Sequence, residues 1–82
     1  MGEQRVDVRA LIEQIAKALV DAPEEVSVEQ IEGETTVFEL TVAPDDLGKV
    51  IGRQGRVARA LRALVGAAGI RARKRFGLEI IE

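Results

Sequence analysis

The sequence predicts an α+β domain in which three helices pack on one face of a three-stranded sheet, in the order α-β-β-α-α-β. Two longer segments repeat apolar residues at spacings of three and four, which is typical of helices with one buried face. Three shorter segments alternate apolar and polar residues and are rich in β-branched side chains, which is typical of strands. With 82 residues, the chain has room for one core, so residues 1–82 are expected to form a single domain.

The first helix is predicted over residues 7–21. Asp7 is its expected N-cap, because a carboxylate accepts hydrogen bonds from the free N–H groups of a first turn. Pro23 cannot continue the helix and biases Ala22 toward extended geometry, so the chain should turn there. The apolar face of this helix consists of Val8, Leu11, Ile12, Ile15, Leu19 and Val20.

Two strands are predicted next, over residues 26–29 and 38–42, where valine, leucine and phenylalanine alternate with polar residues. Gly33 lies between them and is expected to supply the positive φ that a tight hairpin loop requires. Ile31 is out of phase with the alternation that precedes it. This predicts a bulge or an early strand end near Gln30.

A short second helix is predicted from Pro44 through about Ile51. Proline suits the first helical position, and Asp45 and Asp46 would lie near the positive end of the helix, where we expect them to act as capping residues. The alternative for these two aspartates is a metal or acid–base role, but no third ligand stands near them in the sequence.

The third helix is predicted to begin at Gly55 and to end around residues 66–69. Apolar residues keep helical spacing across this segment, and Gly66-Ala67-Ala68-Gly69 is expected to be the C-terminal cap. The last strand follows, with Phe76, Leu78 and Ile80 on its buried side.

The composition excludes most catalytic chemistry. The chain has no Cys and no His, so zinc sites, thiol nucleophiles and histidine acid–base catalysis are not available to it. Only carboxylate or lysine chemistry remains open to an enzyme, and the sequence shows no cluster of polar residues of the kind such a site needs. We therefore expect no enzyme, no cofactor and no metal. Charged residues interrupt the apolar ones throughout, including at Glu3, Arg5, Asp7 and Arg9, so neither a membrane span nor a signal segment is expected and the cytoplasm is the predicted location.

The charge is divided unevenly along the chain. Residues 1–50 contain four basic and twelve acidic side chains, whereas residues 51–82 contain eight basic and two acidic ones. The net charge of −2 therefore conceals a basic C-terminal part. A basic patch on one face, rather than the overall charge, is what a phosphate backbone recognises.

The basic part begins with the segment Gly52-Arg53-Gln54-Gly55, which joins the second and third predicted helices. Two glycines allow a sharp turn and the close approach of another backbone. The N–H groups at the start of the third helix would point at the same place, so an anion could be bound by them together with Arg53 and Arg56. The segment Gly66-Ala67-Ala68-Gly69 has the same glycine spacing but no charged side chain between its glycines.

Two residues before the loop have candidate roles as well. Lys49 could approach a bound phosphate from the near side. Ile51 could line an apolar groove for bases, or it could pack into the core, and both interpretations stay open.

The segment Lys49-Val50-Ile51-Gly52-Arg53-Gln54-Gly55-Arg56 resembles the signature of a KH domain, and the order of the elements is similar to the bacterial type II form of that fold. More narrowly, residues 43–52 and 56–62 resemble the KhpA family of small bacterial proteins with a single KH domain. Ala58 is a departure, because many KH domains have a larger aliphatic residue there.

The resemblance implies that the chain binds single-stranded RNA and that its loop clamps about four nucleotides. It also implies a role as an RNA chaperone or post-transcriptional regulator, a KhpB-like KH protein as partner, and possible self-association as a homodimer. The predicted RNA-binding residues are Lys49, Ile51, Gly52, Arg53, Gln54, Gly55, Arg56 and Arg59.

Other interpretations of the glycines fit less well. Arg56 and Val57 follow Gly55 where a phosphate-binding Walker motif requires Lys and Ser or Thr. The alternative from another class is a protein–protein interaction module with little RNA binding of its own. A second basic cluster also leaves two interpretations open, an extension of the RNA path or a solvated loop; it consists of Arg71, Arg73, Lys74 and Arg75.

Overall fold

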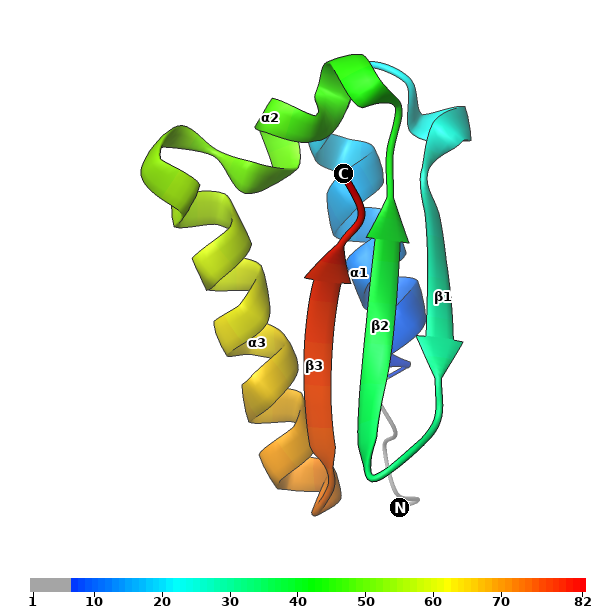
Figure 1. Ribbon diagram of the computed structural model, residues 1–82, viewed down its shortest axis with the longest axis vertical. Helices are drawn as coiled ribbons and strands as arrows, with labels where there is room; N and C mark the ends of the chain where they lie inside the picture. Colours follow the sequence, from blue (N-terminus) through cyan, green and yellow to red (C-terminus); the bar gives the residue numbers. More distant parts are fainter. Residues whose placement is uncertain (1–6) are drawn as a thin grey trace, which may run out of the picture.

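The computed structural model describes residues 7–82 (Figure 1). Short 3₁₀ turns precede β1 and α2 and form the loop between α2 and α3. The elements in chain order are α1 (Val8–Leu19), β1 (Ser27–Ile31), β2 (Thr35–Thr41), α2 (Leu47–Ile51), α3 (Arg56–Ala72) and β3 (Arg75–Ile80).

The three strands form one sheet in the order β1-β2-β3. β1 and β2 are antiparallel neighbours, whereas β3 runs parallel to β2 because the chain crosses over through α2 and α3. α1 packs on β1 and β2, behind the sheet in Figure 1, and α3 packs against β3. The predicted fold class and element order are confirmed.

The core lies between the sheet and the helices. Phe38 and Leu40 of β2 are fully buried there, together with Ile12 from α1 and Val65 from α3. Phe38 also meets Phe76 of β3 edge to face, with 5.3 Å between ring centroids and 84° between ring planes, an arrangement that aromatic pairs favour. The central strand β2 thus supplies the residues at the centre of the core, Phe38 and Leu40.

α1 begins as predicted and ends slightly earlier. The Asp7 carboxylate accepts a hydrogen bond from the Ala10 N–H at 3.1 Å, which confirms the N-cap. The last helical residue is Leu19. On the outer face, the Glu13 carboxylate lies 3.1 Å from both Arg9 and Lys17, and these cations, Lys17 above all, lower its pKa below the ordinary value.

The hairpin between β1 and β2 differs from the prediction in two respects. β1 continues to Ile31, which pairs with Val37 in unbroken register, so the bulge or early end near Gln30 is wrong. Ile31 is out of phase because it faces the opposite side of the sheet from the core. Gly33 does not have a positive φ. Instead, the Glu32 carboxylate fastens the turn by accepting hydrogen bonds from Thr36 Oγ1 at 3.1 Å and from the Gln30 side-chain amide at 2.6 Å.

α3 is longer than predicted, and the segment 66–69 is not its cap. The helix continues to Ala72 and ends with Arg73 in the left-handed conformation, while the Lys74 N–H bonds the Gly69 carbonyl at 2.8 Å. This is the pattern of a Schellman cap. Gly69 stands inside the helix because a Cβ there would lie 2.8 Å from the Lys74 carbonyl oxygen and 3.1 Å from the Phe76 nitrogen. Close packing of α3 on β3 therefore outweighs the low helix propensity of glycine.

Candidate nucleic-acid interface

The Gly52–Gly55 loop lies at one end of the molecule, between α2 and α3 (Figure 1). α2 ends at Gly52, whose N–H still donates to the Gly48 carbonyl at 2.8 Å. The backbone of Gly52 has φ 78° and ψ 171°, a combination that essentially only glycine adopts. A Cβ at this position would lie 2.5 Å from Val57 Cγ2. Both backbone geometry and space therefore require glycine here.

The second half of the loop is left-handed. Gln54 has φ 56° and Gly55 has φ 75°, and the Gly55 N–H bonds the Gly52 carbonyl at 3.1 Å. The Arg59 guanidinium reaches back from the next turn of α3 and donates from Nη1 to the Gln54 carbonyl at 2.9 Å. The loop is thus a turn closed by these two hydrogen bonds, with exposed Arg53 and Gln54 side chains at its tip.

The electrostatics of the loop favour an anion. Arg53, Arg56 and Arg59 are exposed, and within residues 7–82 none of them forms an ion pair with a carboxylate. The first turn of α3 contains no acidic residue, and no side chain caps it. The positive end of the helix dipole and the arginines consequently act at the same place.

The predicted site residues Lys49 and Ile51 contact other parts of the fold. The Lys49 ammonium is 3.2 Å from Asp21 and 3.5 Å from Asp46, and these carboxylates, Asp21 first, raise its pKa above the ordinary value. The Lys49 ammonium is thus held by a carboxylate just after the end of α1. Ile51 is half-buried and packs against the core.

Asp45 and Asp46 were both predicted to cap the second helix, but the Asp46 side chain makes no capping hydrogen bond to α2. Its side chain is buried, and its two oxygens accept hydrogen bonds from the backbone N–H groups of Asp21 at 3.2 Å and Ala22 at 3.0 Å. Burial alone would raise the pKa of this carboxyl, but the two N–H donors and the Lys49 ammonium outweigh it, so the pKa lies below the ordinary value. Asp46 therefore fastens the start of α2 to the segment that follows α1.

The structure adds Arg62 and the free edge of β3, which the sequence prediction missed. The Ile81 N–H bonds the Leu40 carbonyl of β2, so alternate residues of β3, including Leu78, direct their N–H and C=O groups away from β2. Arg62 of α3 donates from Nε to the Leu78 carbonyl at 3.4 Å. In the sequence, the spacing of three residues between Arg59 and Arg62 indicates that the two arginines lie near each other on the helix. Only the fold shows that this part of α3 faces the edge of β3.

Comparison with known proteins identifies the family. Residues 9–80 match the family model described as the KH domain of KhpA and KhpB. The chain belongs to the KhpA/KhpB family of KH domains. This family is non-enzymatic, so membership supports the exclusion of an enzyme. Among residues 7–82, no three acidic side chains are arranged to hold a metal ion, and no helix in that range is both long and apolar enough to cross a membrane.

Relatives at about half identity cover nearly the whole chain. The chain is 51% identical over 75 residues to the RNA-binding protein KhpA of Clostridium acetobutylicum, covering 90% of this chain and all of that one. It is 53% identical over 76 residues to the RNA-binding protein KhpA of Aquifex aeolicus, covering 92% and 96%.

Among solved structures, a crystal structure of Era from Aquifex aeolicus matches the fold with a TM-score of 0.62 at 15% identity. The match covers 98% of this chain but only 31% of the Era chain. This likeness supports the KH-type arrangement of helices and strands.

Proposed function

We propose that the chain binds single-stranded RNA, with the Gly52–Gly55 loop clamping the backbone of about four nucleotides. The observation that carries the proposal is the fixed turn at the start of α3, surrounded by Arg53, Arg56 and Arg59 without carboxylate partners within residues 7–82. The names of the KhpA relatives, which describe RNA-binding proteins, support it.

The glycines and the arginines of the loop have different proposed roles. The two glycines let a sugar–phosphate backbone approach the turn closely, and the arginines neutralise its charge. Arg59 also holds the turn through the Gln54 carbonyl. Bases would lie on the side of Ile51 and of the free edge of β3. Lys49 remains in the predicted set, although its ammonium pairs in the structure with Asp21, which follows α1, and with Asp46, which precedes α2.

The biological setting is part of the proposal. The whole chain, residues 1–82, would act as one KH domain in the cytoplasm, as an RNA chaperone or post-transcriptional regulator. A KhpB-like protein is the proposed partner, which the family description supports because it unites KhpA and KhpB. A clamp of about four nucleotides offers few contacts, so a partner that supplies a second module would raise the affinity through effective concentration.

The test is fluorescence anisotropy with short labelled single-stranded RNAs at two salt concentrations. The variant Arg53→Asp with Gln54→Asp places two carboxylates at the tip of the loop, and aspartate tolerates the left-handed backbone of position 54. The matched control is Arg9→Asp with Gln14→Asp on the outer face of α1, which makes the same chemical changes away from the loop. Circular dichroism checks that both variants fold.

We expect salt-sensitive binding by the unmodified protein, with a logarithmic salt slope of about 0.7 for each phosphate contact. The loop variant should lose this binding, and the α1 control should keep it. Binding that survives in the loop variant at full strength would contradict the clamp.

A second function, association with another protein, is favoured by the outer face of α3. Leu64 is 42% exposed and Ile70 is 79% exposed on this helix. Exposed alanines continue the apolar face at spacings that place them on one side of the helix; they are Ala60, Ala63 and Ala67. Small side chains allow a second helix to approach closely, so this face could pair with another copy of the chain or with a KhpB-like protein.

Multi-angle light scattering tests the self-association. Ala63→Glu places a charge on the outer face of α3, and Ala18→Glu, an exposed alanine of α1, is the matched control. The Ala63 variant should be monomeric at concentrations where the unmodified protein and the control form dimers. A protein that is monomeric without any substitution would remove the homodimer from the proposal.

A further inference from the structure

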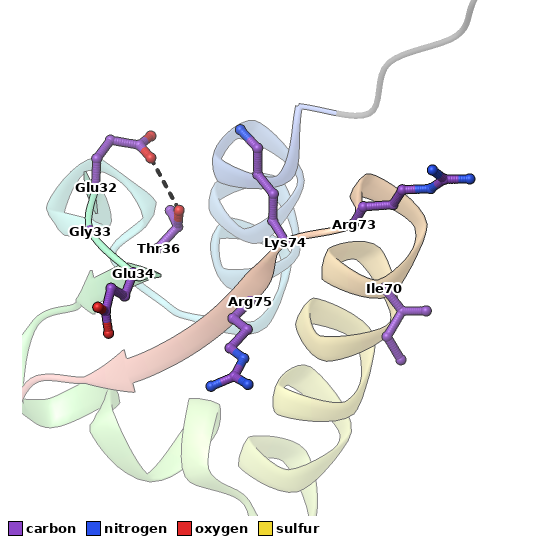
Figure 2. Close-up of a pocket in the computed structure, with 8 residues that line it drawn as sticks. All are labelled: Glu32, Gly33, Glu34, Thr36, Ile70, Arg73, Lys74 and Arg75. Carbon is purple, nitrogen blue, oxygen red and sulfur yellow. Dashed lines mark hydrogen bonds between the residues drawn. The ribbon is translucent and has the colours of Figure 1, made fainter.

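The second basic cluster, which consists of Arg71, Arg73, Lys74 and Arg75, lies at the opposite end of α3 from the loop (Figure 1). All four side chains are exposed. A hollow of about 480 Å³ separates the last three from Glu32 and Glu34 of the hairpin. Figure 2 shows Arg73, Lys74 and Arg75 pointing in different directions, and within residues 7–82 none of the four forms an ion pair.

A structural role explains only part of this cluster. Cations near the C-terminal end of a helix stabilise it through the helix dipole, but the effect falls off within the last turn, and Lys74 and Arg75 lie beyond the end of α3. Arg73 occupies the left-handed position after the helix, with φ 57° and ψ 42°, where glycine is the favoured residue. An arginine at this position incurs a conformational cost in exchange for placing a cation at the tip of α3.

The location of the cluster connects it to the proposed RNA site. α3 has 17 residues, so its ends lie about 25 Å apart at 1.5 Å per residue. Between them, Arg62 lies against the free edge of β3. An RNA that leaves the loop along α3 and this edge therefore passes one further cation, Arg62, before it reaches the cluster.

The opposite face of the sheet is unsuitable for RNA. Glu29 pairs with Glu39 across β1 and β2, and Glu39 pairs with Glu79 across β2 and β3, so three carboxylates form one row. This row repels phosphates, whereas the side of α3 has positive charge at both ends. Arg75 is the member of the cluster that the register places on the same face as Glu79.

We propose that the Arg71–Arg75 cluster is a second phosphate-binding site, which holds the part of an RNA that extends beyond the nucleotides clamped by the loop. The inference rests on the proposed RNA binding at Gly52–Gly55 and extends it by specifying the length of RNA that the domain recognises. The cations point in different directions, so they suit a flexible sugar–phosphate backbone. Contacts to phosphates do not read the identity of the bases, so this second site carries no base preference.

The experiment compares RNAs of about four and about twelve nucleotides, lengths within the range of single-strand binding sites. The variant Arg73→Gln with Lys74→Gln removes two charges from the cluster. Its control, Arg9→Gln with Lys17→Gln, removes two charges from α1. We expect the unmodified protein and the control to bind the longer RNA several-fold more tightly than the shorter one. The cluster variant should bind both lengths alike, and its salt slope for the longer RNA should fall by about 0.7 per lost contact.

A second variant separates this role from a structural one. Arg73→Gly suits the left-handed backbone better than arginine does, so it should raise the thermal midpoint of unfolding while weakening binding of the longer RNA. A purely structural arginine would leave RNA binding unchanged in this variant.

The results distinguish failure of this inference from failure of the proposed function. A cluster variant that binds the longer RNA with unmodified affinity and salt slope would overturn the second site, as would an equal loss in the α1 control. Loss of self-association in the cluster variant with RNA binding intact would also overturn it, in favour of a protein contact. The proposed function fails separately if the Arg53→Asp/Gln54→Asp variant retains binding of the short RNA.

Discussion

At the scale of single residues, three backbone positions shape the loop, and one carboxylate anchors the helix that leads into it. Gly52, Gln54 and Gly55 all have positive φ, and Asp46 anchors the start of α2 to the backbone of Asp21 and Ala22. The arginines contribute charge to a turn whose geometry these residues have already set. Substitutions at the backbone positions and at the arginines should therefore have different consequences for stability.

The two loop glycines should differ in what alanine does to the fold. Gly52→Ala should lower the free energy of unfolding by about 1–3 kcal/mol from backbone strain, and the clash with Val57 adds to this loss. Gly55→Ala should cost only about 1–2 kcal/mol, because its Cβ would meet only the mobile end of Arg59, at 3.4 Å. Urea denaturation measures both, and an equal or larger loss for Gly55→Ala would contradict this account.

Asp46 should make stability depend on acidic pH. Its pKa in the folded protein lies below the ordinary 3.8. Its contribution to stability is therefore present above that value and is lost as the pH falls through the lower folded pKa. Asp46→Asn should reduce stability at neutral pH and give a shallower decline of stability below about pH 4.

Denaturation at a series of pH values measures this effect. Asp45→Asn is the control, because Asp45 is an exposed neighbour of the same residue type, and it should leave the stability at neutral pH nearly unchanged. An Asp46→Asn variant as stable as the unmodified protein at neutral pH would show that the anchor does not stabilise the fold. Glu13, whose pKa is also lowered, keeps part of the acid decline in either variant.

At the scale of elements, α3 combines several tasks along its length. Its first turn completes the loop, its buried face packs on β3, and its last turn contains Arg71, the first residue of the basic cluster. Two glycines lie within it, and their surroundings differ. Nothing lies within 4 Å of a Cβ built on Gly66, whereas Gly69 contacts the start of β3.

Alanine should therefore have opposite effects at the two helical glycines. Gly66→Ala should stabilise the protein by about 0.5–1 kcal/mol, because alanine is the better helix former and the site has room. Gly69→Ala should destabilise it by about 1–3 kcal/mol, since the extra methyl group forces α3 away from β3. Thermal unfolding of the two variants checks this, and stabilisation of both would mean that α3 and β3 are less closely packed than described.

At the scale of the whole molecule, charge is sorted by surface. The loop, Arg62 and the basic cluster follow α3, while Glu29, Glu39 and Glu79 form an acidic row on the open face of the sheet. The overall charge of −2 gives no sign of this division. A polyanion approaching the protein meets one attractive and one repulsive surface, so the charge pattern orients it before contact.

The acidic row should cost stability. Glu39 lies between Glu29 and Glu79 in the sheet register, and like charges directly opposite each other in a sheet are unfavourable. Glu39→Gln should raise the free energy of unfolding by about 0.2–1 kcal/mol, and the gain should shrink as added salt screens the charges. Denaturation at low and high salt measures this. Glu24→Gln, exposed in the turn before β1, is the matched control and should show no such gain.

The sequence by itself determined the element order, the buried faces of the strands, the Asp7 cap and the position of the glycine loop. These features depend on local periodicity and on the conformational limits of glycine and proline, which act within a few residues and can be recognised in the chain.

Only the tertiary structure decided the features that depend on packing between distant segments. Gly69 belongs inside α3 because of its approach to Phe76, Asp46 bonds backbone 24 and 25 residues away instead of capping its own helix, and Arg62 meets the edge of β3. The hairpin likewise uses the Glu32 side chain where a positive φ at Gly33 was predicted. In each case the favourable contact is made by a group far away or by a side chain whose partner the folded geometry selects, so local propensity alone could not identify it.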